Sequence, residues 1–129
     1  MTITAPTRII TLTLALFALV LAGCGESEED EFASDVNEIC REATGDIRAA
    51  AGKRDELIAA VDRFIADLKA ADPPEDQKDD YDAWVATQEK TFGELKSAIE
   101  ANDQERIDAV SETAGDDQAR ELGLDDCTG

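Results

Sequence analysis

The stretch KRDELIAAVDRFIADLKAADPP, residues 53–74, carries the pattern that decides the fold. Its apolar side chains recur at steps of three and four residues, which places them on one face of a helix. They are Leu57, Ile58, Val61, Phe64, Ile65 and Leu68. Pro73 and Pro74 stop the pattern, because proline lacks an amide donor and restricts the residue before it. The segment therefore predicts an amphipathic helix from about residue 53 to residue 71.

The same spacing occurs on the N-terminal side, in residues 32–51. The apolar positions there are Phe32, Val36, Ile39, Cys40, Ala43, Ile47 and Ala50. Asp35, with Glu38 three residues later, has the spacing of a capping box at a helix start. Gly52 is suited to end this helix, since glycine commonly takes the left-handed conformation at helix ends.

Two further helices are expected on the C-terminal side. A third, over residues 75–100, carries Tyr81, Trp84, Val85, Gln88, Phe92, Leu95 and Ile99 on one side. A weaker fourth starts with the capping-box spacing of Asn102 and Glu105 and carries Ile107, Val110, Ala114 and Leu122. Gly115 costs a helix about 1 kcal/mol relative to alanine, so a break there is one expected form. Gly123, followed by the apolar Leu124, resembles a helix C-terminal cap.

These elements predict an all-α fold, a small up-down-up-down four-helix bundle or three helices with a broken fourth. In that topology the early part of the first helix and the end of the fourth lie at the same pole. Cys40 and Cys127 fall at these two places, so a disulfide between them is predicted for an exported chain. Two free thiols, or pairing with another protein, are the alternatives.

The first 24 residues predict export. Arg8 is the only charged side chain before the uncharged run 9–22, which is shorter than the roughly 20 residues that span a bilayer. Leu21-Ala22-Gly23-Cys24 then precedes an acidic stretch. The segment resembles bacterial lipoprotein signals, which implies cleavage before Cys24 and a diacylglycerol on its thiol. An ordinary signal peptide cut later and an uncleaved anchor are the alternatives. The expected organisation is a signal peptide over 1–23, a lipidated cysteine and acidic tether over 24–31, and a helical domain over 32–129.

Composition excludes several functions. The chain has 31 acidic and 12 basic residues and a net charge of −19, so nucleic acid is not an expected partner. It has no histidine, which rules out histidine-based catalytic triads and histidine-ligated zinc, haem or copper. Its one methionine is Met1, which belongs to the predicted signal peptide. No cofactor, metal site or catalytic residue is expected, and the protein is predicted not to be an enzyme.

Two groups of residues are candidate sites. The densest acidic cluster is Asp72, Glu75, Asp76, Asp79, Asp80 and Asp82. It lacks the glycine of a calcium-binding loop, so a solvated helix start is the favoured interpretation. Tyr81, Trp84 and Gln88 share a helical face that is either the wall of a pocket for an apolar ligand or the bundle core.

Three segments carry a resemblance to a group of proteins: residues 37–43 (NEICREA), Pro73-Pro74 before Tyr81 and Trp84, and residues 119–127 (ARELGLDDC). Together they resemble small secreted actinobacterial lipoproteins of unassigned function. The resemblance implies a helical domain with two paired cysteines, and it implies no reaction.

The expectation for function is a non-enzymatic interaction module on the extracytoplasmic face of the cell membrane. It would be held in the bilayer through Cys24, and its acidic surface would meet a cationic envelope protein, polymer or peptide. The alternatives are a binder of small apolar ligands and a carboxylate-based hydrolase of the cell wall.

Overall fold

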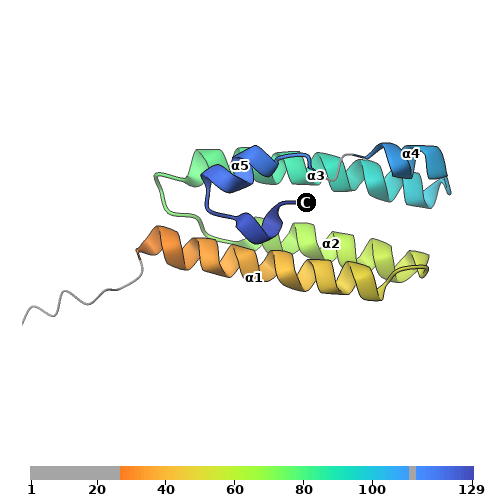
Figure 1. Cartoon of the computed structure of the whole chain (residues 1–129), viewed down its shortest axis with the longest axis horizontal. Coiled ribbons are helices and arrows are strands. Elements are labelled where there is room, and N and C mark those ends of the chain that lie inside the picture. The colour runs from red at the N-terminus through yellow and green to blue at the C-terminus, as the bar shows by residue number, and fades with distance from the viewer. Residues whose placement is uncertain (1–26, 111–112) are drawn as a thin grey trace, which may run out of the picture.

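The computed structural model describes residues 27–110 and 113–129, and all regular structure in those ranges is helical (Figure 1). Three long helices are α1 (Glu28–Ala49), α2 (Arg54–Ala70) and α3 (Lys78–Glu100). Two short helices, α4 (Gln104–Ala109) and α5 (Asp116–Glu121), and the 3-10 turn η1 (Asp125–Cys127) follow. The all-α prediction is confirmed, and the fourth helix takes the broken form.

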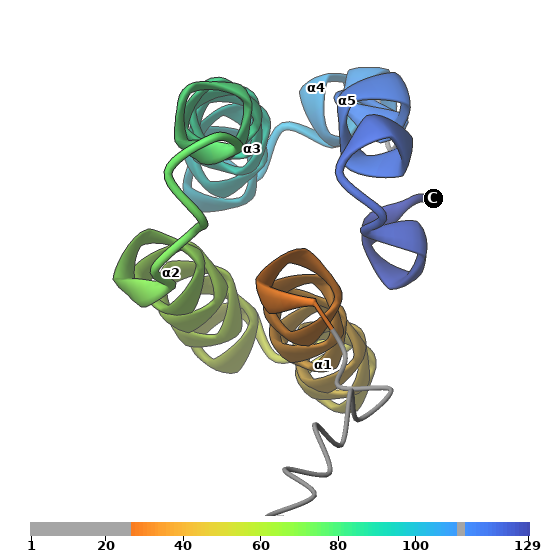
Figure 2. The ribbon, with the colours of Figure 1, turned by 90° about the vertical axis from the view of Figure 1, so that its left-hand side faces the viewer.

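The long helices alternate in direction, and α4 and α5 run back along α3 (Figure 1). In the end-on view of Figure 2, α2 lies between α1 and α3. The fourth side of the bundle is divided, because α5 contacts α3 whereas η1 contacts α1. The arrangement is therefore an up-down-up-down bundle whose last member consists of three short pieces.

The start of α1 differs from the prediction. The helix begins at Glu28 rather than residue 32, and Ser27 caps it in place of Asp35. The Ser27 hydroxyl accepts from the Asp30 amide at 3.2 Å, and the Asp30 carboxylate accepts from the Ser27 amide at 3.4 Å. Acidic side chains in a first turn interact favourably with the helix dipole. Residues 28–31, assigned to the acidic tether, are for this reason helical.

Left-handed residues end three of the helices, two of them at glycine as predicted and one at an asparagine. Gly52 (φ 79°) follows α1, and Gly123 (φ 72°) follows α5, as predicted. At the end of α5 the Leu124 amide donates to the Ala119 carbonyl at 2.8 Å, the bond of a Schellman cap. Asn102 (φ 54°) ends α3 in the same way, so the predicted cap of the fourth helix is off by one residue. Asp103 caps α4 instead, accepting from the Arg106 amide at 3.1 Å.

The tightly packed core occupies the half of the bundle where α5 and η1 complete the fourth side. Its largest fully buried side chains are Trp84, Tyr81, Leu68, Leu124 and Val36. The Phe32 and Tyr81 rings meet edge to face with their centres 4.9 Å apart. In the other half the apolar side chains of Ile47 and Leu95 are only partly buried.

Gly115 marks the break in the fourth helix, and its surroundings require glycine. Its φ is 87°, and a Cβ atom there would lie 2.8 Å from Nε2 of Gln88 and 3.2 Å from Cδ1 of Trp84. The backbone therefore passes directly over these two buried side chains. Both the left-handed conformation and the close approach exclude a larger residue.

We expect Gly115→Ala to lower the free energy of unfolding by about 1 to 3 kcal/mol, because it adds both backbone strain and a clash. Gly93→Ala is the matched control. Gly93 lies inside α3 with nothing within 4 Å of its Cβ position, so alanine should stabilise the protein by about 0.5 to 1 kcal/mol. Chemical denaturation of both variants measures the difference, and equal destabilisation would contradict the proposed packing.

Candidate functional site

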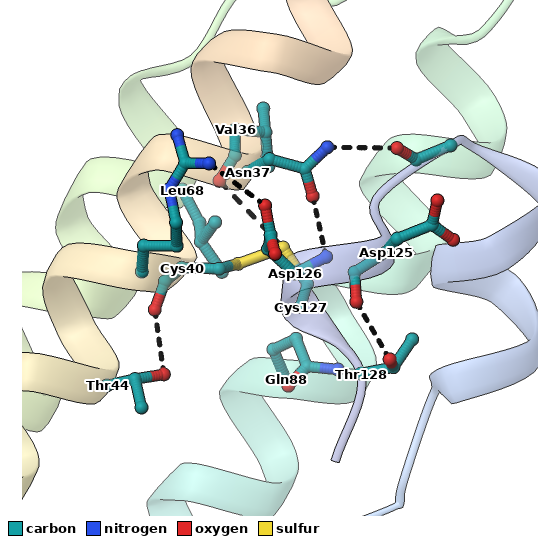
Figure 3. The surroundings of a disulfide bond; sticks show 12 residues. Val36, Asn37, Cys40, Thr44, Leu68, Gln88, Asp125, Asp126, Cys127 and Thr128 are labelled. Atoms are coloured by element: carbon teal, nitrogen blue, oxygen red, sulfur yellow. Dashed lines mark hydrogen bonds and ion pairs between the residues drawn. A yellow bond between two sulfur atoms is a disulfide. The ribbon is translucent and has the colours of Figure 1, made fainter.

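A disulfide joins the middle of α1 to the C-terminal tail (Figure 3). Cys40 and Cys127 are 87 positions apart in the chain, and their Cα atoms are 5.1 Å apart. The predicted pairing is confirmed. Cys40 is buried in the core cluster, so the bond fastens the tail directly onto packed side chains.

Two neighbours of Cys40 on α1 hold the same tail by polar contacts. The Asn37 side chain donates to the Gly123 carbonyl at 3.0 Å and accepts from the Asp126 amide at 2.9 Å. Arg41 pairs with the Asp126 carboxylate at 3.3 Å. Sequence reasoning did not assign these roles. The available signal was that Asn37 and Arg41 are four residues apart and so share a helix face.

We expect the double substitution of Cys40→Ala and Cys127→Ala to lower the free energy of unfolding by about 4 to 5 kcal/mol, because the bond joins residues 87 positions apart in the unfolded chain. Thermal unfolding with and without a reducing agent measures the effect. Reduction should lower the melting temperature of the wild type and leave the double variant unchanged. An unchanged wild-type value would show that the bond does not stabilise the protein.

The predicted face of Tyr81, Trp84 and Gln88 lies in the interior, with exposed fractions of 2%, 0% and 6%. The Tyr81 hydroxyl donates at 2.8 Å to the Leu68 carbonyl, one of the last four of α2, which have no partner within the helix. Burial raises the pKa of Tyr81, so this donor stays protonated. Nε2 of Gln88 donates to the Ala114 carbonyl at 3.0 Å. These side chains connect α2, α3 and the fourth segment.

An acidic groove of about 760 Å³ lies between α1 and the end of α2. Six carboxylate side chains line it: Glu28, Glu31, Asp35, Glu42, Asp67 and Asp72. Its apolar lining comes from Phe32, Ile39, Ala70, Ala71, Pro73 and Pro74. No lysine or arginine of the described ranges lines it, so the groove combines an apolar surface with concentrated negative charge.

Helical spacing explains how α1 builds its wall of the acidic groove. Glu28, Glu31, Asp35 and Glu42 follow one another at steps of three, four and seven residues, which place them on one helix face. The prolines after α2 supply the remaining edge. Sequence reasoning missed this face, because residues 28–31 were assigned to a tether rather than to the helix.

The carboxylates of the acidic groove have no basic partners among the described residues. Within residues 27–110 and 113–129, none of the six forms an ion pair. Some acids elsewhere do: Asp62 pairs with Lys96 and Glu89 with Lys69, both at 2.7 Å. Glu29, near the same pole, has its pKa raised by a hydrogen bond with Asp76 and by that residue's negative charge. Carboxylates at this end of the molecule are therefore crowded and poorly neutralised.

The acidic cluster noted in the sequence is dispersed in the structure. Of its members only Asp72 lines the acidic groove, whereas Asp79 and Asp80 lie exposed in the first turn of α3. Asp82 pairs with Lys78 at 2.7 Å. In the described part of the chain, no three acidic or thiol side chains are grouped so as to hold a metal ion.

The predicted lipidation box, Leu21, Ala22, Gly23 and Cys24, lies outside the described residues. None of the helices that are described is long and apolar enough to cross a membrane. Comparison with protein-family models, with curated proteins and with solved structures gave no match. The fold and site are therefore those of a helical bundle that is closed by a disulfide and carries an acidic groove.

Proposed function

We propose that this protein is a lipid-anchored, non-enzymatic interaction module on the extracytoplasmic face of the cell membrane, and that its acidic groove binds a cationic segment of an envelope protein or peptide. The observation that carries the proposal is the set of six carboxylates without an ion pair among the described residues, lining one groove. Bringing positive charge into such a groove neutralises repulsion that the folded chain leaves in place.

The apolar part of the groove narrows the class of partner. Phe32 and Ile39 from α1 and the Pro73-Pro74 turn lie beside the acids. A partner that offers alternating lysine and leucine side chains matches both kinds of lining. Apolar contact supplies binding that salt does not screen, whereas charge pairing supplies orientation and rapid association.

The anchor and the acidic groove are close together in the chain. Cys24 precedes Glu28 by four residues, and an extended chain spans at most about 3.6 Å per residue. Lipid attachment at Cys24 would therefore hold the α1 side of the groove near the bilayer surface. Partners bound there would lie next to the membrane rather than far out in the envelope.

Neutralising three acids of the groove tests the binding proposal. We expect the combination of Asp35→Asn, Glu42→Gln and Asp67→Asn to weaken binding of a synthetic peptide of repeating Lys-Leu units about tenfold, since exposed ion pairs are individually weak. Fluorescence anisotropy of the labelled peptide measures the dissociation constant. Raising the ionic strength from about 0.01 M to about 0.15 M, which shortens the Debye length from about 30 Å to about 8 Å, should weaken wild-type binding as well.

The matched control removes the same charge elsewhere: Glu94→Gln, Glu100→Gln and Glu121→Gln. These three exposed residues do not line the acidic groove. Their combined change should alter the dissociation constant far less than the groove variant does. Equal losses in the two variants would show that the peptide responds to net charge, and the proposal for the groove would be wrong.

The anchoring proposal has its own test. Mass spectrometry of the protein purified from bacterial membranes should find Cys24 as the first residue, with its thiol bearing diacylglycerol. Cys24→Ser should abolish the modification, because serine has no thiol to alkylate. An unmodified Cys24, or a mature chain that begins elsewhere, would contradict the anchor without affecting the groove.

A further inference from the structure

A second groove, of about 490 Å³, lies beside the break in the fourth helix. We call it the apolar groove. Its apolar lining comes from Ala43 and Ile47 of α1, Phe64 of α2, Phe92 and Leu95 of α3, and Val110 and Ala114 on either side of the break. The Cys40–Cys127 disulfide also borders it. It shares no lining residue with the acidic groove.

The apolar groove exists because the fourth side of the bundle is incomplete. In the described ranges α4 packs against α3 and has no close contact with α1 or α2. The pieces α5 and η1 cover the other half of the molecule. Ile47, Leu95 and Val110 consequently keep part of their surface exposed. In an unbroken four-helix bundle these are the positions that the last helix would cover.

The size of the apolar groove suits a small molecule. Ligand sites typically occupy roughly 300 to 1,000 Å³ and combine apolar walls with a few placed polar groups. The polar groups here include Thr44, Thr91, Thr128 and Gln88.

One unpaired basic side chain borders the apolar groove. Arg48 is the only lysine or arginine among its lining residues, and its side chain makes no ion pair or hydrogen bond within residues 27–110 and 113–129. Most other basic side chains of this acidic protein are paired. Asp126 also borders the groove, but its carboxylate is engaged by Arg41 at 3.3 Å. The groove therefore offers an unneutralised cation beside an apolar trough.

We propose that the apolar groove binds a long-chain fatty acid. The acyl chain lies along Ile47, Phe64 and the α3 side chains Phe92 and Leu95, and the carboxylate pairs with Arg48. An anionic head is favoured over a cationic one because a guanidinium forms charge-assisted hydrogen bonds with a carboxylate. The site is independent of the proposed peptide groove, because it uses other residues and the opposite charge.

Photo-crosslinking tests the site in the membrane-purified full chain. A palmitate analogue with a diazirine near the end of its chain should label residues 43–47 of α1 and 91–95 of α3, as mapped by mass spectrometry. Unlabelled palmitate should compete, and dodecyltrimethylammonium, which carries the opposite charge, should compete poorly. Labelling confined to the acidic groove or to the residues before Ser27 would overturn the proposal.

Two arginine variants separate the head-group contact from general charge. Arg48→Gln should raise the half-saturating concentration of the palmitate probe about tenfold, as expected for the loss of one charge-assisted hydrogen bond. It should leave labelling by the corresponding fatty alcohol probe unchanged. Arg106→Gln is the control, because Arg106 is exposed, has no ion pair in the described ranges and does not line the groove. Equal effects of the two variants would overturn the assignment of Arg48.

A third variant tests the trough itself. Leu95→Trp adds bulk at a partly buried wall position, so it should reduce labelling of α1 and α3 by both probes. Circular dichroism should show unchanged helicity and melting. Undiminished labelling at the same residues in a folded variant would show that the chain does not lie in the apolar groove. Lys-Leu peptide binding should be unaffected, so failure here and failure of the proposed function are distinguishable.

Discussion

The attachment of the C-terminal tail to the middle of α1 is the constraint on which the rest of this bundle depends. Isolated helices shorter than about 12 to 15 residues are marginal in water, and α4 and α5 have six residues each. α5 persists because the Cys40–Cys127 bond and the amide of Asn37 hold the segment that follows it, whereas α4 packs against α3. Leu122 and Leu124, both buried, add apolar contact at the same place.

This attachment closes the fourth side of the bundle at one end, whereas beside the break Ile47 and Leu95 stay partly exposed. Where α5 and η1 complete the fourth side, Tyr81, Trp84 and Leu68 are fully enclosed. Beyond the break at Gly115 the fourth side is occupied only in part, and the apolar groove remains. The acidic groove has a different origin, in the carboxylate face of α1 and the proline turn after α2. One strongly charged chain thus presents two grooves of contrasting chemistry.

Several features of this fold could be predicted from local patterns. Apolar periodicity located the three long helices, and Pro73-Pro74 located the end of α2. The break near Gly115 and the cap at Gly123 followed from the conformational freedom of glycine. The start of α1 was placed too late, because a run of acids suggests a solvated tether although Ser27 and Asp30 form a capping box. The face of Tyr81, Trp84 and Gln88 was open to two interpretations, a pocket wall or the bundle core, because both produce the same helical spacing of side chains.

The sequence by itself determined the helices and their order, because these depend on side chains within a few residues of one another. It also identified the two cysteines able to form a disulfide. Tertiary structure decided which alternative Cys40 and Cys127 follow, by bringing their Cα atoms to 5.1 Å. It also decided both grooves. Asp35 and Asp67 line one groove only because α1 packs on α2, and Arg48 and Phe92 line another that the incomplete last helix leaves uncovered. Such neighbours are tens of residues apart in the chain, and no local pattern specifies that distance.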